Sequence, residues 1–235
     1  MDRISKQKFN IMILVDTSKS MAGKRMEQVN QAISDIAIYL KDMQKENSHV
    51  DFYISILSFS TEAKWFDDEK QTFVNKFTFK PLVAKGQSNL HLAYQELNQV
   101  MLKESQGGIM PDFGGVAPII LLLTDGHPSK GNVKKELELL RSKPWFKVAL
   151  KYGIAIELND ERTIKVLREF TSGNGDVIQV YNSFLIERII KIIILTASKV
   201  KSCSNSIHNN KYANITEEIQ QEIAESLQTV EDWEW

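Results

Sequence analysis

Residues 11–20 read IMILVDTSKS, and residues 118–126 read PIILLLTDG. Each stretch holds an unbroken apolar run that leads to an aspartate, Asp16 or Asp125, which is the pattern of a strand buried on both faces of a parallel sheet. The pair therefore predicts two central strands. Further strands are expected at residues 51–60, 63–66, 73–79, 152–158 and 177–181.

Helical patterns separate these strands. In residues 24–44, apolar residues such as Val29, Ile33 and Ile36 recur at steps of three and four, which places them on one face of a helix. The alternation predicts an α/β fold in which a doubly wound, mostly parallel central sheet is covered by helices on both faces. Other helices are expected at residues 89–101, 133–141, 161–171 and 184–199.

The predicted domain spans residues 1–200 and is followed by a polar linker at 201–214 and an acidic C-terminal helical tail at 215–235. The tail carries seven acids and no Lys or Arg, so a total charge of −1 leaves +6 on the rest of the chain. Its narrow apolar stripe suits docking either on the chain's own domain or on a charged partner.

The loop at 107–115, with four glycines and a proline, is expected to be mobile surface.

The composition, with 43% hydrophobic and 25% charged residues, is that of an ordinary soluble globule. A single cysteine, Cys203, excludes an internal disulfide and a Cys-based zinc site, and the first residues lack an apolar signal region. We therefore expect a cytoplasmic protein.

The apolar stretch at 186–195 is interrupted by charges and is shorter than the roughly 20 residues that span a bilayer, so it predicts a buried helix. Scattered basic residues argue against a nucleic-acid partner.

Oxygen-bearing side chains occur at three places that the predicted topology brings to one edge of the sheet. Asp16, Ser18 and Ser20 project to the same side of an extended chain after the first strand. Asp125 ends the other central strand, and Ser88, in the turn GQSNL, opens the second predicted helix. Open α/β sheets bind ligands beyond the carboxyl ends of their strands, where the strand order reverses. These five residues are therefore predicted to form a metal site.

The donor types indicate which metal such a site would hold. Carboxylate and hydroxyl oxygens are hard ligands that suit Mg²⁺, with Mn²⁺ or Ca²⁺ as alternatives, and no His or Cys pair has the spacing of a zinc site. Two carboxylates balance one divalent cation, and neutral hydroxyls leave the cation able to accept a carboxylate from another molecule. The pattern favours a recognition site, completed by an Asp or Glu of a protein partner, over a storage site.

The segments ILVDTSKSM, GQSNL and LLLTDGHPS together resemble the metal-ion-dependent adhesion site of von Willebrand factor A domains. The resemblance covers residues 8–198 and implies a sheet with one antiparallel edge strand. The implied direct metal ligands are Ser18 and Ser20, while Asp16 and Asp125 are implied to bind the metal directly or through water. The role implied by the family is metal-dependent protein binding.

Within this family the chain is most similar to the TerY-like branch, which is associated with tellurium resistance and stress response. The likeness is carried by MEQVNQAI, by SFSTEAK and by the Gly/Pro-rich loop before TDG. One departure from the family pattern is Ser88, which stands where the family has a threonine but keeps the hydroxyl. The branch implies an adaptor in a bacterial stress, tellurite-resistance or defence system, with a protein kinase or a PP2C-type phosphatase as partners.

Further residues are candidate contacts for a protein partner. Lys24 and Arg25 follow the first motif and suit an acidic partner, although solvated charges on a helix are the simpler interpretation. His127 lies in the loop after the second motif, where it is either a partner contact or a turn residue. Trp233 and Trp235 close the acidic tail.

A magnesium-dependent enzyme for phosphoryl transfer is the main alternative, because a site of this kind can also serve that chemistry. The chain lacks the G-x-x-x-x-G-K-[ST] loop, and Ser18 stands where a haloacid dehalogenase needs an acid. No Ser/His/Asp or Cys/His arrangement is apparent either. A third possibility, a domain that retains its motif only as a relic, predicts no metal dependence. We expect the chain to have no catalytic activity of its own.

Overall fold

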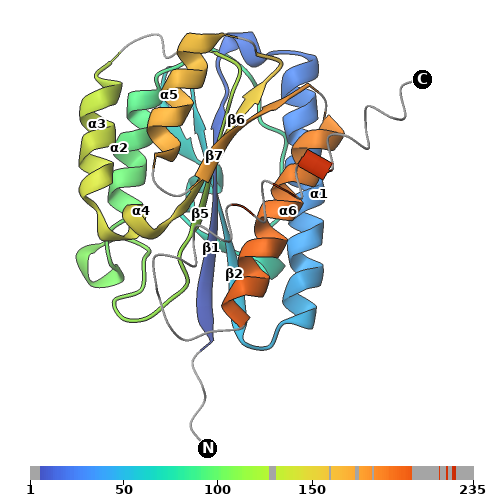
Figure 1. Ribbon diagram of the computed structural model, residues 1–235, viewed down its shortest axis with the longest axis vertical. Helices are drawn as coiled ribbons and strands as arrows, with labels where there is room; N and C mark the ends of the chain where they lie inside the picture. The colour runs from blue at the N-terminus through green and yellow to red at the C-terminus, as the bar shows by residue number, and fades with distance from the viewer. Residues whose placement is uncertain are drawn as a thin grey trace, which may run out of the picture.

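A central sheet runs through the molecule and has helices on both faces (Figure 1). The computed structural model describes residues 6–126, 131–158, 160–172, 175–181 and 183–202, together with residues 217, 221, 224 and 225. The strands are β1 (Gln7–Asp16), β2 (Val50–Phe59), β3 (Ala63–Trp65), β4 (Thr72–Phe73), β5 (Ile119–Thr124), β6 (Leu150–Ile156) and β7 (Gly175–Val180). The α-helices are α1 (Lys24–Glu46), α2 (Leu90–Val100), α3 (Val133–Ser142), α4 (Pro144–Val148), α5 (Glu161–Thr171) and α6 (Ser183–Ser202).

The strand order is β3-β2-β1-β5-β6-β7, and β4 also pairs with β2. Neighbouring strands from β2 to β7 are parallel, whereas β3 and β4 are antiparallel to β2. The predicted doubly wound, mostly parallel sheet with an antiparallel edge is thus confirmed. From β1 the chain adds β2 on one side and later β5, β6 and β7 on the other, so the strand order reverses between β1 and β5.

Alternate residues of β1 enter two hydrophobic layers. Ile11 and Ile13 pack in the layer of α1 and α6, whereas Met12 and Leu14 pack in the layer that contains α2, α3 and α5 (Figure 1). All four side chains are fully buried. An unbroken apolar run is required here because a strand covered on both faces has no side that can carry polar residues into water.

Helix α6 contains the apolar stretch that the sequence predicts as a buried helix. Ile189, Ile190 and Ile193 are buried in the layer that α6 shares with α1, which confirms this prediction. Among the described residues, no helix is both long and apolar enough to cross a membrane. The predicted linker from residue 203 onward and most of the predicted acidic tail lie outside the described residues.

The strand expected at residues 73–79 is mostly wrong. Strand β4 covers only Thr72–Phe73 and is followed by a 3₁₀ turn. Beyond that turn, Phe77 packs against Phe66 with 5.5 Å between the ring centroids. Phe77 and Phe79 therefore pack with Phe66 in a cluster of rings instead of continuing the ladder of hydrogen bonds.

The loop at residues 107–115 lies only partly at the surface: Gly107, Phe113 and Gly114 are exposed, as its composition predicts, but its middle is not. Ile109 and Met110 are buried in the same apolar layer as α2. The N–H of Ile109 donates to the carbonyl of Val100 at 3.2 Å, and the N–H of Met110 donates to that of Leu102 at 3.1 Å. Two apolar side chains thus anchor the first half of the loop to the body of the domain.

A lysine lies buried at the amino edge of the sheet. Lys151, in β6, is 1% exposed, and its Nζ donates to the carbonyls of Phe146 (3.1 Å) and Ala149 (3.0 Å). The ammonium group also lies 5.0 Å from the ring centroid of Phe146. Burial, with a smaller contribution from the charge of Arg141, lowers the pKa of Lys151 to about 8.

The free energy of unfolding should therefore rise with pH above about pH 8 because of Lys151. In this range the folded protein has released the Lys151 proton while the unfolded chain still binds it, and stability rises with pH wherever the unfolded state binds more protons. A shift of this size corresponds to about 3 kcal/mol. In urea unfolding, Lys151→Met should lack this rise, while Lys165→Met, which removes an exposed lysine, should keep it. Equal pH dependence in the wild type and Lys151→Met would contradict the assignment.

Candidate functional site

The five residues predicted to bind a metal lie together at the carboxyl edge of the sheet, beside the reversal of strand order between β1 and β5. Asp16 is the last residue of β1, Asp125 directly follows β5, and Ser88 precedes α2. These three side chains and that of Ser18 are buried, whereas Ser20 is exposed. Open α/β sheets bind their ligands at this position.

A backbone contact holds the segment before α2 against the turn that follows β1. The N–H of Lys19, in that turn, donates to the carbonyl of Gly86 at 3.0 Å. Gly86 has a φ of +79°, and a Cβ added there would lie 2.2 Å from the hydroxyl oxygen of Thr61, so the position requires glycine. The GQSNL segment is thereby placed so that Ser88 reaches the end of β1.

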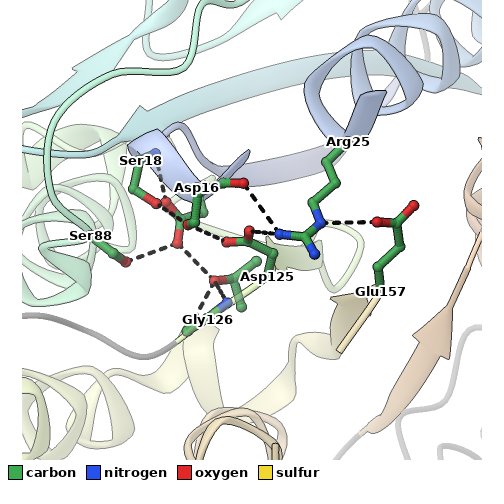
Figure 2. Close-up of polar contacts among 9 residues, drawn as sticks. Asp16, Ser18, Arg25, Ser88, Asp125, Gly126 and Glu157 are labelled. Carbon is green, nitrogen blue, oxygen red and sulfur yellow. Dashed lines mark hydrogen bonds and ion pairs between the residues drawn. The ribbon is translucent and has the colours of Figure 1, made fainter. Parts of the chain in front are cut away.

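The Asp16 carboxylate is the centre of a hydrogen-bond network (Figure 2). Its Oδ1 accepts from the N–H of Ser18 (2.8 Å), and its Oδ2 accepts from the hydroxyls of Ser88 (2.8 Å) and Thr124 (2.7 Å). Burial raises the pKa of Asp16, although these hydrogen bonds act in the opposite direction. One buried carboxylate thus joins the ends of β1 and β5 to the segment before α2.

A second chain of hydrogen bonds crosses the cluster. The Ser20 hydroxyl donates to Oδ1 of Asp125 (2.8 Å), and its oxygen lies 3.1 Å from Oγ of Ser18. A hydroxyl has a single proton, and that of Ser20 is directed at Asp125, so Ser18 is the donor in the second contact. The serines of the DTSKS turn and Asp125 therefore form one continuous network.

Arg25 lies within the cluster. Its Nη1 pairs with Oδ2 of Asp125 at 2.7 Å and donates to the Ser20 carbonyl at 3.2 Å, while its Nε pairs with Oε2 of Glu157 at 3.0 Å (Figure 2). The Arg25 side chain is 32% exposed and that of Asp125 is 0% exposed. The interpretation of Arg25 as a solvated helix charge is therefore wrong, whereas its role in binding a partner stays a prediction.

Two residues of the cluster, Thr124 and Glu157, are absent from the set predicted by the sequence. Thr124 is the last residue of β5, and Glu157 directly follows β6 just as Asp125 follows β5. The same signal marks both residues, namely a polar side chain at the carboxyl end of a central strand. Applied to every parallel strand, that rule places both residues at this edge of the sheet, but it does not identify the groups that they contact.

Exposed lysines surround the turn after β1. Lys24 is exposed at the start of α1, and Lys19 and Lys85 are exposed on the two segments joined by the backbone contact at Gly86. Three exposed lysines therefore lie on the segments that border the cluster. Three further candidates for partner contacts lie outside the described residues: His127, Trp233 and Trp235.

The chemistry of the donor set fits a hard divalent cation. Two carboxylates and three hydroxyls belong to the connected networks described above, and these are the oxygen ligands that suit Mg²⁺, Mn²⁺ or Ca²⁺. In the part of the chain that the structure describes, no group of three or more His, Cys, Asp or Glu side chains is placed to hold a metal. A cation at this edge would therefore depend on the serine hydroxyls.

Comparison of the sequence with known families and proteins finds a match over most of the chain. The family model described as von Willebrand factor type A domain matches residues 10–191. Heavy chain H1 of the inter-alpha-trypsin inhibitor from Sus scrofa is 26% identical over 133 residues, which cover 54% of this chain and 14% of that protein. The match thus spans about a seventh of that relative's length.

Solved structures share the architecture. "Von Willebrand factor type A from Catenulispora acidiphila" superimposes with a TM-score of 0.60 at 13% identity, covering 82% of this chain and 43% of that chain. The pilus adhesin SpaC from Lactobacillus rhamnosus GG, in its open conformation, gives a TM-score of 0.59 at 12% identity. The superposition covers 83% of this chain and 30% of the adhesin chain. At such identities the likeness establishes the fold alone.

Removing the Thr124 hydroxyl should destabilise the protein. Thr124→Val keeps the shape of the side chain but leaves the buried Asp16 carboxylate one hydrogen bond short, which should lower the free energy of unfolding by about 1–3 kcal/mol. Urea unfolding measures the change. Thr124→Ser is the matched control, because it keeps the hydroxyl and loses only a methyl group. The assignment is wrong if Thr124→Val is at least as stable as this control.

Proposed function

The chain belongs to the von Willebrand factor type A domain family, and we propose that it is a protein-interaction module whose binding depends on a divalent cation. The observation that carries the proposal is the convergence of oxygen-bearing side chains from three separate segments at the reversal of strand order. Mg²⁺ is the proposed cation, with Mn²⁺ or Ca²⁺ as alternatives. The residues that would hold it are Asp16, Ser18, Ser20, Ser88 and Asp125.

The charges of the cluster favour an acidic partner. When bound, the cation would supply an electrophilic coordination position. Asp16 and Asp125 together balance a divalent charge and the serine ligands are neutral, so an approaching carboxylate is not repelled by an excess of negative charge. The exposed Lys19, Lys24 and Lys85 add attraction, which acts over a Debye length of about 10 Å at moderate ionic strength. We propose that the partner presents an Asp or Glu side chain to this edge.

We also propose that the chain does not catalyse phosphoryl transfer at this site. Both oxygens of Asp16 already accept hydrogen bonds, from the Ser18 N–H and from the hydroxyls of Ser88 and Thr124. A carboxylate held in this way is poorly disposed to attack a phosphorus atom. The position two residues later, which a haloacid dehalogenase uses for a second acid, is Ser18.

The cellular setting that we propose is a cytoplasmic adaptor of the TerY-like type, acting in stress response or tellurite resistance with a protein kinase or a PP2C-type phosphatase. Support for this assignment comes from the segments MEQVNQAI and SFSTEAK and from the Gly/Pro-rich loop before TDG. The inter-alpha-trypsin inhibitor relative adds no support for this branch, so the assignment rests on these sequence features.

Cation binding should depend on the Ser20 hydroxyl. In isothermal titration calorimetry with Mg²⁺ or Mn²⁺, Ser20→Ala should weaken binding by about tenfold or more, because it removes an oxygen ligand that a hard cation prefers. Ser34→Ala, a serine of α1 outside the cluster, is the control and should bind as the wild type does. Equal affinities for the wild type and Ser20→Ala would contradict the proposed ligand set.

Capture of a protein partner should depend on the cation. The tagged wild-type chain is expected to retain a partner from native lysate in Mg²⁺ and to lose it in EDTA, whereas Asp16→Ala should not retain it under either condition. The partner is identified by mass spectrometry, and the purified pair is then titrated with and without Mg²⁺.

Two results would contradict the proposed function. Identical captures in Mg²⁺, in EDTA and with Asp16→Ala would remove the role of the cation. Turnover of a generic phosphatase substrate with Mg²⁺, abolished in Asp16→Ala, would instead establish an enzyme.

A further inference from the structure

We propose that Arg25 is an internal counter-cation, which competes with a divalent cation for Asp125 and so sets the affinity of the site; this inference rests on the function proposed above. Arg25 is in the first turn of α1, directly after the DTSKS turn. Within the described ranges of the chain, no other basic side chain forms an ion pair with Asp16 or Asp125. The competition is therefore assigned to a single guanidinium group.

Both carboxylate oxygens of Asp125 accept hydrogen bonds, and Arg25 donates to one of them. Oδ1 accepts from the Ser20 hydroxyl, and Oδ2 accepts from Nη1 of Arg25 at 2.7 Å. The Asp125 side chain is 0% exposed, so water contributes little to neutralising its charge. Hydrogen bonds between two charged groups are the stronger kind. A cation that needs Asp125 has to share the carboxylate with Arg25 or displace the guanidinium.

Glu157 offers the guanidinium a second anion. Its Oε2 accepts from Nε of Arg25 at 3.0 Å. The N–H of Glu157 donates to the carbonyl of Val180 at 2.8 Å, so a contact with β7 fixes the residue, which has a φ of +48° that residues other than glycine seldom adopt. Glu157 is thus held beside Arg25 and can keep the guanidinium when Asp125 releases it.

These charges give Arg25 and Glu157 opposite effects on cation affinity. The positive charge of Arg25 repels a second cation beside Asp125, and the burial of that carboxylate limits screening by salt. The negative charge of Glu157 offsets this repulsion and draws the guanidinium toward itself. Removing the charge of Arg25 should tighten cation binding, and removing the charge of Glu157 should weaken it. A purely structural role would predict weaker binding from both changes.

Calorimetric titration of the full chain with Mn²⁺ tests these opposite effects. Arg25→Gln is expected to lower the Kd for Mn²⁺ by about fivefold or more, and Glu157→Gln is expected to raise it by about threefold. Lys165→Gln is the control, because it removes the same charge from an exposed residue of α5 that takes no part in the cluster. This control should change the Kd by less than about twofold. Circular dichroism confirms that each variant is folded.

The outcomes separate this inference from the proposed function. If wild type binds Mn²⁺ and Arg25→Gln binds no more tightly, or if Lys165→Gln has an equal effect, the counter-cation role is overturned while the proposed function stands. If Arg25→Gln binds Mn²⁺ and the wild type does not, the result supports the inference in a stronger form, in which Arg25 blocks the cation site completely. If no folded variant binds Mn²⁺, both proposals are overturned.

A substitution that keeps the charge covers the case in which Arg25→Gln does not fold. Arg25→Lys loses the planar fork that reaches Asp125 and Glu157 together. It should therefore bind Mn²⁺ more tightly than wild type, and equal or weaker binding overturns the inference.

Discussion

A buried carboxylate at the end of β1 is the constraint on which the arrangement of the cluster depends. Asp16 is 0% exposed, and burying such a group is costly unless its oxygens accept hydrogen bonds. The donors come from its own turn, from Ser88 before α2 and from Thr124 at the end of β5. The electrostatic requirement of one side chain thus brings together segments that are far apart in the sequence, and the remaining hydroxyls and acids gather around them.

Much of the fold could be predicted from the sequence, because apolar patterning determines which residues must be buried. The apolar runs in β1 and β5 indicate strands buried on both faces. Together with the helical periodicity of α1, they predict a parallel sheet that is covered by helices. Helix α4 could not be predicted from the sequence, because its five residues are too few to show a helical period. In residues 107–115 the glycines suggested exposure, but burial of Ile109 and Met110 determines where that loop lies.

The candidate site was predictable to the extent that it follows from strand ends. Asp16 and Asp125 end adjacent strands, so their proximity follows from the topology. The ion pair between Arg25 and Glu157 cannot be predicted from the ends of the strands. The two residues are 132 positions apart in the chain, and their contact depends on how the first turn of α1 lies over the sheet. Thr124 was absent from the predicted site residues because it closes an apolar run. Only the direction of its side chain in the structure shows that it donates to Asp16.

The direction of β1 determines how the molecule can be attached to a support. Gln7 begins β1 and Asp16 ends it, so the two residues lie at opposite edges of the sheet, and a strand of ten residues is about 30 Å long. A sensor surface or fluorophore coupled at Gln7 would lie about one strand length from the cluster and leave the lysines around it free in solution. Random amine coupling would instead react with the exposed Lys19, Lys24 and Lys85 and place the cluster against the matrix.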